Sequence, residues 1–174
     1  MIERLIDFLL GFLDQLLPFK VVNQTDKGVL LRFGKFIKTI EPGIHFKIPF
    51  ADEITPHTVL WTTQSLPAQS LTTKDGKDVV VKAVIKYRII NVETFLLEVW
   101  DAIDAISDMT QGIIFDTIKE KTWEELQTTE LKPLITGKAR SEAKRWGIEV
   151  ETVTLSDLAK ITSIRLINDG SILS

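Results

Sequence analysis

The spacing of apolar residues in this chain changes at Asn91, and that change sets the fold class. Over residues 79–90 apolar and polar residues alternate, which is typical of a strand buried on one side. Over residues 102–121 apolar residues recur every three or four positions, as on one face of a helix. Strand patterns precede Asn91, helical patterns follow it, and an alternating run returns over residues 148–155. The sequence therefore predicts an α+β fold, with an antiparallel sheet followed by helices.

Two shorter strands are predicted before the long one, over residues 29–33 and 44–48, because β-branched and aromatic residues gather there. Turn-forming residues separate the strands, at positions 26–28, Pro42, Gly43, Pro49, Asp75 and Gly76. Asp75-Gly76 predicts a tight hairpin before the long strand. The face of that strand expected to be buried consists of Val79, Val81, Ala83, Ile85, Tyr87 and Ile89.

Helices are predicted over residues 93–99, 102–121 and about 130–146. Between the last two, Thr122 and Glu125 have the spacing of a capping box, in which each side chain satisfies the other residue's exposed amide. Gly147 is placed to end the last helix. A further strand is expected over residues 161–167.

The most apolar stretch lies at residues 2–17. On a helical wheel its polar residues fall within an arc of roughly 120°. At ~1.5 Å per residue it falls short of the ~30 Å hydrocarbon core, and it carries three acids, so a spanning helix is disfavoured. A signal peptide is also disfavoured, since Arg4 is the only early cation. We therefore expect an amphipathic helix, ended by Pro18, in the plane of a membrane interface. Its membrane-contact residues would be Ile2, Leu5, Ile6, Leu9, Phe12, Leu13 and Leu16.

Two other uses of that helix stay open. It could cover the domain's own core, or it could pack against copies of itself. Trp61, which follows Pro56 and the predicted strands, is a further candidate for a membrane interface.

Composition excludes several kinds of chemistry. The 174 residues include no cysteine, which removes disulfides, thiolate metal sites and thiol nucleophiles. A net charge of -3 argues against nucleic acid as the main partner. The usual phosphate-loop, dinucleotide, zinc-protease and serine-hydrolase motifs do not occur. His45 and His57 lack neighbours at ligand spacing and are expected to be packing or surface residues. We therefore predict no catalytic, cofactor or metal site, and no enzyme.

Charged residues gather in two predicted helices. Asp101, Asp104 and Asp108 form an acidic row, and the later helix is basic, around Lys138, Arg140 and Lys144. Solvated outer faces explain both groups. A contact between the acidic row of one copy and the basic helix of the next is a second hypothesis.

Residues 28–35 (GVLLRFGK) and 42–50 (PGIHFKIPF), followed by Asp52, closely resemble the opening of the SPFH, or band 7, family. This family includes stomatins, prohibitins, flotillins and bacterial membrane-protease regulators. Residues 73–76 and 146–151 agree with it in order and spacing, so the resemblance covers about residues 20–160. The motif residues are expected to specify the fold, with Gly28, Gly34 and Gly43 at turns. They are Gly28, Arg32, Phe33, Gly34, Pro42, Gly43, Pro49, Asp75, Gly76, Trp146 and Gly147.

The resemblance implies an SPFH domain over residues 19–160, an amphipathic segment over 1–18 and a short extension over 161–174. Family members are understood to be membrane-bound scaffolds that form rings with copies of themselves, and some regulate a membrane protease. Relatives continue into a long heptad-bearing helix, whereas this sequence shows no heptads and resembles a minimal version without the coiled coil. That difference puts a closed cage in doubt.

We therefore expect a membrane-associated, homo-oligomeric scaffold on the cytoplasmic face, with membrane lipid and itself as partners. A membrane protease or another membrane protein is a further candidate partner. The alternative is a regulatory binding subunit of a membrane protease or of another SPFH assembly.

Overall fold

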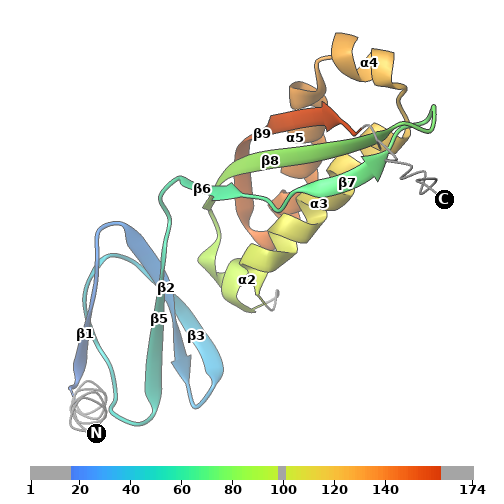
Figure 1. The fold of residues 1–174 in the computed structure, drawn as a ribbon. Helices are drawn as coiled ribbons and strands as arrows, with labels where there is room; N and C mark the ends of the chain where they lie inside the picture. The colour runs from blue at the N-terminus through green and yellow to red at the C-terminus, as the bar shows by residue number, and fades with distance from the viewer. Residues whose placement is uncertain (1–16, 98–100, 162–174) are drawn as a thin grey trace, which may run out of the picture.

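The computed structural model describes residues 17–97 and 101–161. The amphipathic helix expected over residues 2–17 and the strand expected over residues 161–167 lie almost entirely outside the described residues. The described chain consists of an N-terminal β unit and a C-terminal unit in which helices cover a sheet (Figure 1).

The N-terminal unit consists of two small antiparallel sheets. Strand β1 pairs with β4, and β2 lies between β3 and β5. The strand bounds are β1 Phe19–Val22, β2 Asp26–Arg32, β3 Lys35–Ile40, β4 Gly43–Phe46 and β5 Asp52–Thr58. A small core of Val22, Leu30, Ile40 and Ile54 is buried within this unit.

The C-terminal unit is organised by the long strand β8, which pairs with β6 and β7 along one edge and with β9 along the other. Helix α3 packs beneath β7, α5 packs beneath β9, and the two helices contact each other on one face of the sheet (Figure 1). The strands are β6 Thr62–Ser65, β7 Gln69–Thr72, β8 Asp78–Ile89 and β9 Ile148–Lys160. The helices are α2 Val92–Leu97, α3 Ala102–Lys119, α4 Trp123–Thr128, α5 Leu131–Ala143 and the 3₁₀ turn η1 Lys144–Trp146.

The period-two pattern of β8 is confirmed, because all six residues of its predicted inner face are buried in the main core. The opposite face carries cations that pair across to β9. Lys86 lies 2.6 Å from Glu151, and Arg88 lies 2.6 Å from Glu149. The sheet is therefore apolar toward the helices and charged toward solvent.

The two units meet where α2 packs on β2. The His57 ring lies edge-on to Phe95, with centroids 5.0 Å apart, and Val29 of β2 belongs to the main core. His57 is thus a packing residue, which is one of the two roles expected from the sequence.

The structure confirms the capping box and the end of the last helix. Glu125 N donates to Thr122 Oγ1 (3.3 Å), and Thr122 N donates to Glu125 Oε2 (2.8 Å). Gly147 follows η1 in the left-handed conformation, with φ of 72°.

Two details of the strand prediction are wrong. Residues 26–28 do not break a strand, because β2 begins at Asp26 and Gly28 lies inside it, against β5. A Cβ at Gly28 would lie 2.7 Å from the carbonyl oxygen of Thr55, so close strand packing, not a turn, requires glycine there. Strand β9 also runs to Lys160, five residues beyond the predicted end, because β8 supplies pairing partners along that whole length.

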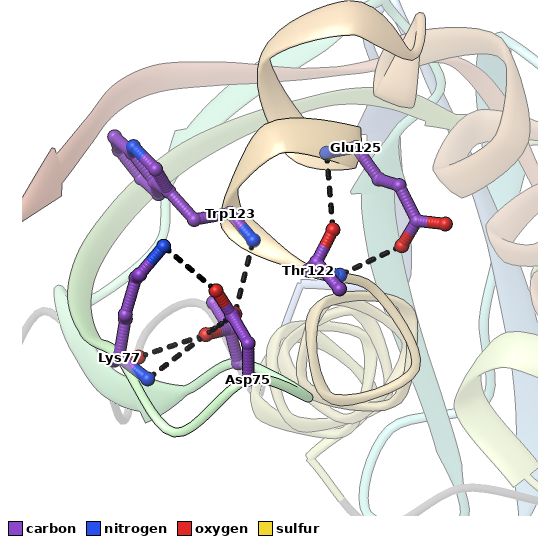
Figure 2. A network of polar contacts seen from close by, with 6 residues as sticks. Asp75, Lys77, Thr122, Trp123 and Glu125 are labelled. Carbon is purple, nitrogen blue, oxygen red and sulfur yellow. Dashed lines mark hydrogen bonds and ion pairs between the residues drawn. The ribbon is translucent and has the colours of Figure 1, made fainter.

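The hairpin between β7 and β8 is tied to the start of α4 through Asp75 (Figure 2). The Asp75 carboxylate accepts hydrogen bonds from the Trp123 amide (3.1 Å) and the Thr73 hydroxyl (2.6 Å), and it pairs with Lys77 (2.8 Å). These contacts, the Lys77 and Thr73 hydrogen bonds above all, hold the pKa of Asp75 well below its usual range. Asp75 thus joins the end of the sheet to the helical layer.

Substitution of Gly147 by alanine should lower the free energy of unfolding by about 2 kcal/mol or more, because φ is positive and a Cβ would lie 2.5 Å from the Asn91 carbonyl oxygen. Gly137→Ala is the matched control, since α5 leaves its Cβ position open and alanine should raise helix stability by up to about 1 kcal/mol. Urea unfolding followed by circular dichroism measures both changes. Equal effects of the two substitutions would contradict the packing shown at Gly147.

Asp75→Asn should destabilise the protein near neutral pH, and its effect should shrink as the pH falls. The folded-state pKa of Asp75 is lowered, so its stabilising contribution is present above the ordinary aspartate pKa of about 3.9 and is lost as the pH falls through the folded value. Thermal unfolding of both proteins between about pH 7 and pH 2 tests this. Asp116→Asn, at an exposed position of α3, is the control. A Tm difference independent of pH would contradict the assignment.

Candidate functional site

One face of the β1–β4 ribbon is apolar and open to solvent. Phe19 lies opposite Phe46, and Val21 lies opposite Ile44, and directly opposed residues share a face of an antiparallel pair. Ile44 and Phe46 are 76% and 75% exposed. We call these four residues the ribbon face; they contribute little to the core of the N-terminal unit.

A second exposed aromatic residue lies in the turn between β2 and β3. Arg32 pairs with Lys35, so Phe33 and Gly34 form a two-residue loop, and both have positive φ (49° and 75°). Hairpins of this kind favour asparagine or glycine at both positions. Phe33 occupies one of them and is 83% exposed.

The loop before β5 also places a phenylalanine at positive φ. The Ala51 amide donates to the Ile48 carbonyl (3.2 Å), which places Pro49 and Phe50 at the two central positions of a turn. Phe50 has φ of 64°, at the position where such turns favour glycine, and it is 67% exposed.

The two turns share one physical feature, a bulky side chain in a left-handed backbone conformation. That conformation costs roughly 1–2 kcal/mol per residue relative to the right-handed one. Neither Phe33 nor Phe50 recovers this cost by burial, because both side chains are exposed. Strain of this kind persists where a side chain has a use outside the fold.

A partly buried ion pair holds the two turns together. Arg32 Nε and Nη2 lie 2.7 and 3.0 Å from the two Asp52 oxygens, and the Asp52 side chain is 1% exposed. The Ile48 amide also donates to Asp52 (3.0 Å), and the Phe33 amide donates to the Ala51 carbonyl (2.8 Å). The Arg32 hydrogen bond, followed by that of the Ile48 amide, lowers the pKa of Asp52, so the carboxylate stays ionised.

The two turns and the ribbon face meet at one end of the N-terminal unit. The start of β1, the β2–β3 turn and the start of β5 lie together at the bottom of Figure 1. We call Phe33, Ile48 and Phe50, with the ribbon face, the apolar end. Exposed apolar surface gathered in this way marks a contact with lipid or another protein.

Within residues 17–97 and 101–161, no three His, Cys, Asp or Glu side chains lie close enough to hold a metal ion. His45 Nε2 lies 2.6 Å from the Glu41 carbonyl oxygen, a local contact between β4 and the turn that precedes it. In the same part of the chain, no helix has the length and apolar character needed to cross a membrane.

The structure brings some sequence-predicted residues together and separates others. Arg32, Phe33, Gly34 and Pro49 converge at the apolar end. Pro42 and Gly43 lie at the opposite end of β4, and Asp75, Gly76, Trp146 and Gly147 lie in the C-terminal unit. The seven membrane-contact residues predicted between Ile2 and Leu16 lie outside the described residues.

Trp61 lies away from the apolar end. Its ring is covered by Arg88, at 4.6 Å, and by Lys86, at 5.7 Å, beside the solvent face of the C-terminal sheet. A membrane contact by Trp61 stays a prediction.

Sequence reasoning missed the ribbon face and Phe50. Residues 44–48 alternate between apolar and polar residues, and this alternation predicts a strand with one face in the core. The signal that could have revealed Phe50 is the Pro49-Phe50 pair itself, because a turn with proline at its first central position commonly places glycine next.

With its β unit followed by a helix-covered sheet, the chain also matches a family model. The model, described as SPFH domain / Band 7 family, matches residues 20–162, and the chain belongs to this family. A Methanocaldococcus jannaschii protein is 31% identical over 142 residues, which cover 79% of this chain and 70% of that protein.

Two Escherichia coli relatives have functional names. The modulator of FtsH protease HflK is 29% identical over 110 residues, 63% of this chain. The modulator of FtsH protease HflC is 34% identical over 84 residues, 44% of this chain. These matches cover only 26% of HflK and 25% of HflC, so the chain corresponds to about a quarter of each.

Phe33→Asn should leave the free energy of unfolding unchanged or raise it by up to about 1 kcal/mol, because asparagine tolerates positive φ and no packing is lost. Phe36→Asn is the control, since Phe36 packs against the main core and its loss should cost roughly 2 kcal/mol or more. Urea unfolding compares the two variants. If both substitutions destabilise the protein equally, the Phe33 side chain stabilises the fold and its left-handed backbone is not a net cost.

Proposed function

We propose that this chain is a subunit of a membrane-associated scaffold of the SPFH type, with the apolar end in the membrane interface and identical subunits at its sides. The observation that carries the proposal is the pair of strained, exposed phenylalanines, Phe33 and Phe50. At both positions a strained backbone places an aromatic ring on the protein surface, where it is free to contact a membrane or a partner.

A lipid interface is a suitable environment for these side chains. Moving an exposed phenylalanine side chain into an apolar medium gains about 1.5–3 kcal/mol. Two phenylalanines, Ile48 and the ribbon face together form an exposed apolar surface of the kind that binds peripherally at a membrane interface. The rigid Arg32–Asp52 pair supports this use, because it fixes both turns before contact and so reduces the ordering cost.

The apolar segment at residues 2–17 supports the same orientation. It precedes β1, whose first residue, Phe19, belongs to the apolar end. If that segment binds lipid as its pattern predicts, both contacts lie on one side of the molecule. The cytoplasmic face is the side that we propose.

The names of the HflK and HflC relatives favour a second candidate function. Both are modulators of the FtsH protease. A regulatory subunit that binds a membrane protease, or another SPFH assembly, would use the apolar end against protein instead of lipid. In either case the chain acts by binding, without catalysis of its own.

Flotation with vesicles tests lipid contact. The full chain should float with neutral phosphatidylcholine vesicles and stay bound at high salt, because apolar burial is not screened. The double substitution of Phe33 and Phe50 by asparagine should weaken binding about tenfold or more, given the transfer energy of each ring. Leu9→Asp should also weaken it, by placing a charge in the predicted apolar face of residues 2–17. Leu134→Asn, at an exposed site on α5, is the matched control.

Unchanged flotation of the double variant would exclude the apolar end as the lipid contact. A wild-type chain that floats only with vesicles containing a membrane protease would favour the regulatory function. Release of the wild-type chain by salt would contradict a mechanism based on apolar burial.

A further inference from the structure

The two edges of the C-terminal sheet carry charge of opposite sign. Helix α3 lies beneath the edge of the sheet that β6 and β7 form, and near β6 it exposes Asp104 and Asp108. At the β9 edge, α5 and the turn after it expose Arg140 and Lys144. We call the first pair the acidic flank and the second pair the basic flank.

These charges lack the partners that other charges in the unit have. Lys86 and Arg88 on the solvent face of the sheet each pair with a glutamate of β9. Within residues 17–97 and 101–161, Asp104, Asp108 and Lys144 form no ion pair. Each flank thus presents charge that forms no ion pair within the part of the chain that the structure describes.

Arg140 has a structural contact but no acidic partner. Its guanidinium donates to the carbonyl oxygens of Val150 (3.0 Å) and Glu151 (2.8 Å), along the free edge of β9. This contact holds the positive charge at the sheet edge and leaves it unneutralised by a carboxylate in the described chain.

The flanks lie at the same level along the strands, as the register of β8 shows. On one side, Ile103 of α3 lines a cavity together with Arg88 and Ile89 of β8. In addition, the Gln64 side chain donates a hydrogen bond to the Ser107 hydroxyl of α3 (3.1 Å), and Gln64 is paired with Ile85 of β8. The acidic residues beside Ile103 and Ser107 therefore lie level with residues 85–89 of β8.

The basic flank lies at that same level. The Val150 carbonyl accepts a hydrogen bond from Arg140, and Val150 is paired with Tyr87 of β8. Lys144 lines a shallow cavity together with Ile90 and Ile148. Subunits placed side by side, with sheets at equal height, would therefore bring the acidic flank of one subunit opposite the basic flank of the next.

Apolar groups accompany the charges on both flanks. The cavity beside Lys144 includes Ile90, which is exposed, and Ile148. Glu149 also lines it, and its carboxylate is paired with Arg88 of the sheet. Ile103 and Phe115 are partly exposed on α3. Such a mixture of unpaired charge and exposed apolar groups is typical of a protein interface.

We propose that a second copy of this chain occupies each flank, with the acidic flank of one subunit against the basic flank of its neighbour. The inference rests on the proposed scaffold function and names its lateral contact. Like flanks repel, so the contact is head-to-tail, and a head-to-tail contact that closes produces a ring. Of the basic residues identified from the sequence, Arg140 and Lys144 border the contact directly, and Lys138 adds charge from the same helix.

Charge reversal tests the contact in the full-length chain in nanodiscs, with mass photometry as the readout. An acidic-flank variant carries Asp104→Lys and Asp108→Lys. A basic-flank variant carries Lys138→Glu and Lys144→Glu. Arg140 is left in place so that its hydrogen bonds to the β9 carbonyls are kept. Each variant alone should lose most of its oligomer, because its two flanks then have the same sign.

Two further samples separate the contact from a general loss of stability. An equimolar mixture of the two variants should recover oligomers in which the variants alternate, and a chain with all four substitutions should assemble alone. Asp116→Lys and Lys132→Glu, at the opposite ends of the same helices, are matched controls that should assemble like wild type. Circular dichroism verifies that each variant is folded.

Assembly of the single-flank variants, or failure of the mixture to recover it, would overturn the inference. If the wild-type chain assembles and the reversals change nothing, the lateral contact is wrong while the scaffold function stands. If the wild-type chain is monomeric at all concentrations, the assembly part of the proposed function fails as well. Vesicle flotation tests membrane binding independently of both results.

Discussion

The antiparallel pairing of β8 with β9 is the contact on which the C-terminal unit depends. It joins residue 79 to residue 160 and residue 89 to residue 148, and so brings together strands that are separated by all the helices. The buried face of β8 gives α3 and α5 a common surface, and the edge positions of β7 and β9 decide which helix lies on which side. The opposite charges of the two flanks follow from that placement.

The N-terminal unit is less optimised for stability, because it exposes aromatic side chains in strained turns. Its small core is separate from the main one. Two of its turns hold phenylalanine at positive φ, where glycine or asparagine would adopt the same backbone conformation with less strain. The Arg32–Asp52 pair compensates by joining the two turns through side chains and backbone amides. A chain selected for stability alone would bury these aromatic rings or replace them. Their exposure therefore supports a role in binding.

Much of the fold could be predicted because local patterns and tertiary structure agree. The alternation in β8, the Thr122–Glu125 capping box and the left-handed Gly147 depend on neighbouring residues, and each occurs as the sequence indicates. The errors arose where a distant segment decides the outcome. Gly28 belongs to a strand because β5 packs against it, and β9 extends to Lys160 because β8 offers a partner.

The sequence by itself determined the α+β class, the family motifs and the lack of recognised catalytic motifs, because these depend on residue type and spacing. Only the tertiary structure decided which apolar residues are exposed. Alternation shows that Ile44 and Phe46 share a face, but it cannot show whether another layer covers that face. The same holds for Asp104 and Lys144, whose positions at equal height on opposite edges follow from the register of β8 with its neighbours, a long-range property that no local pattern encodes.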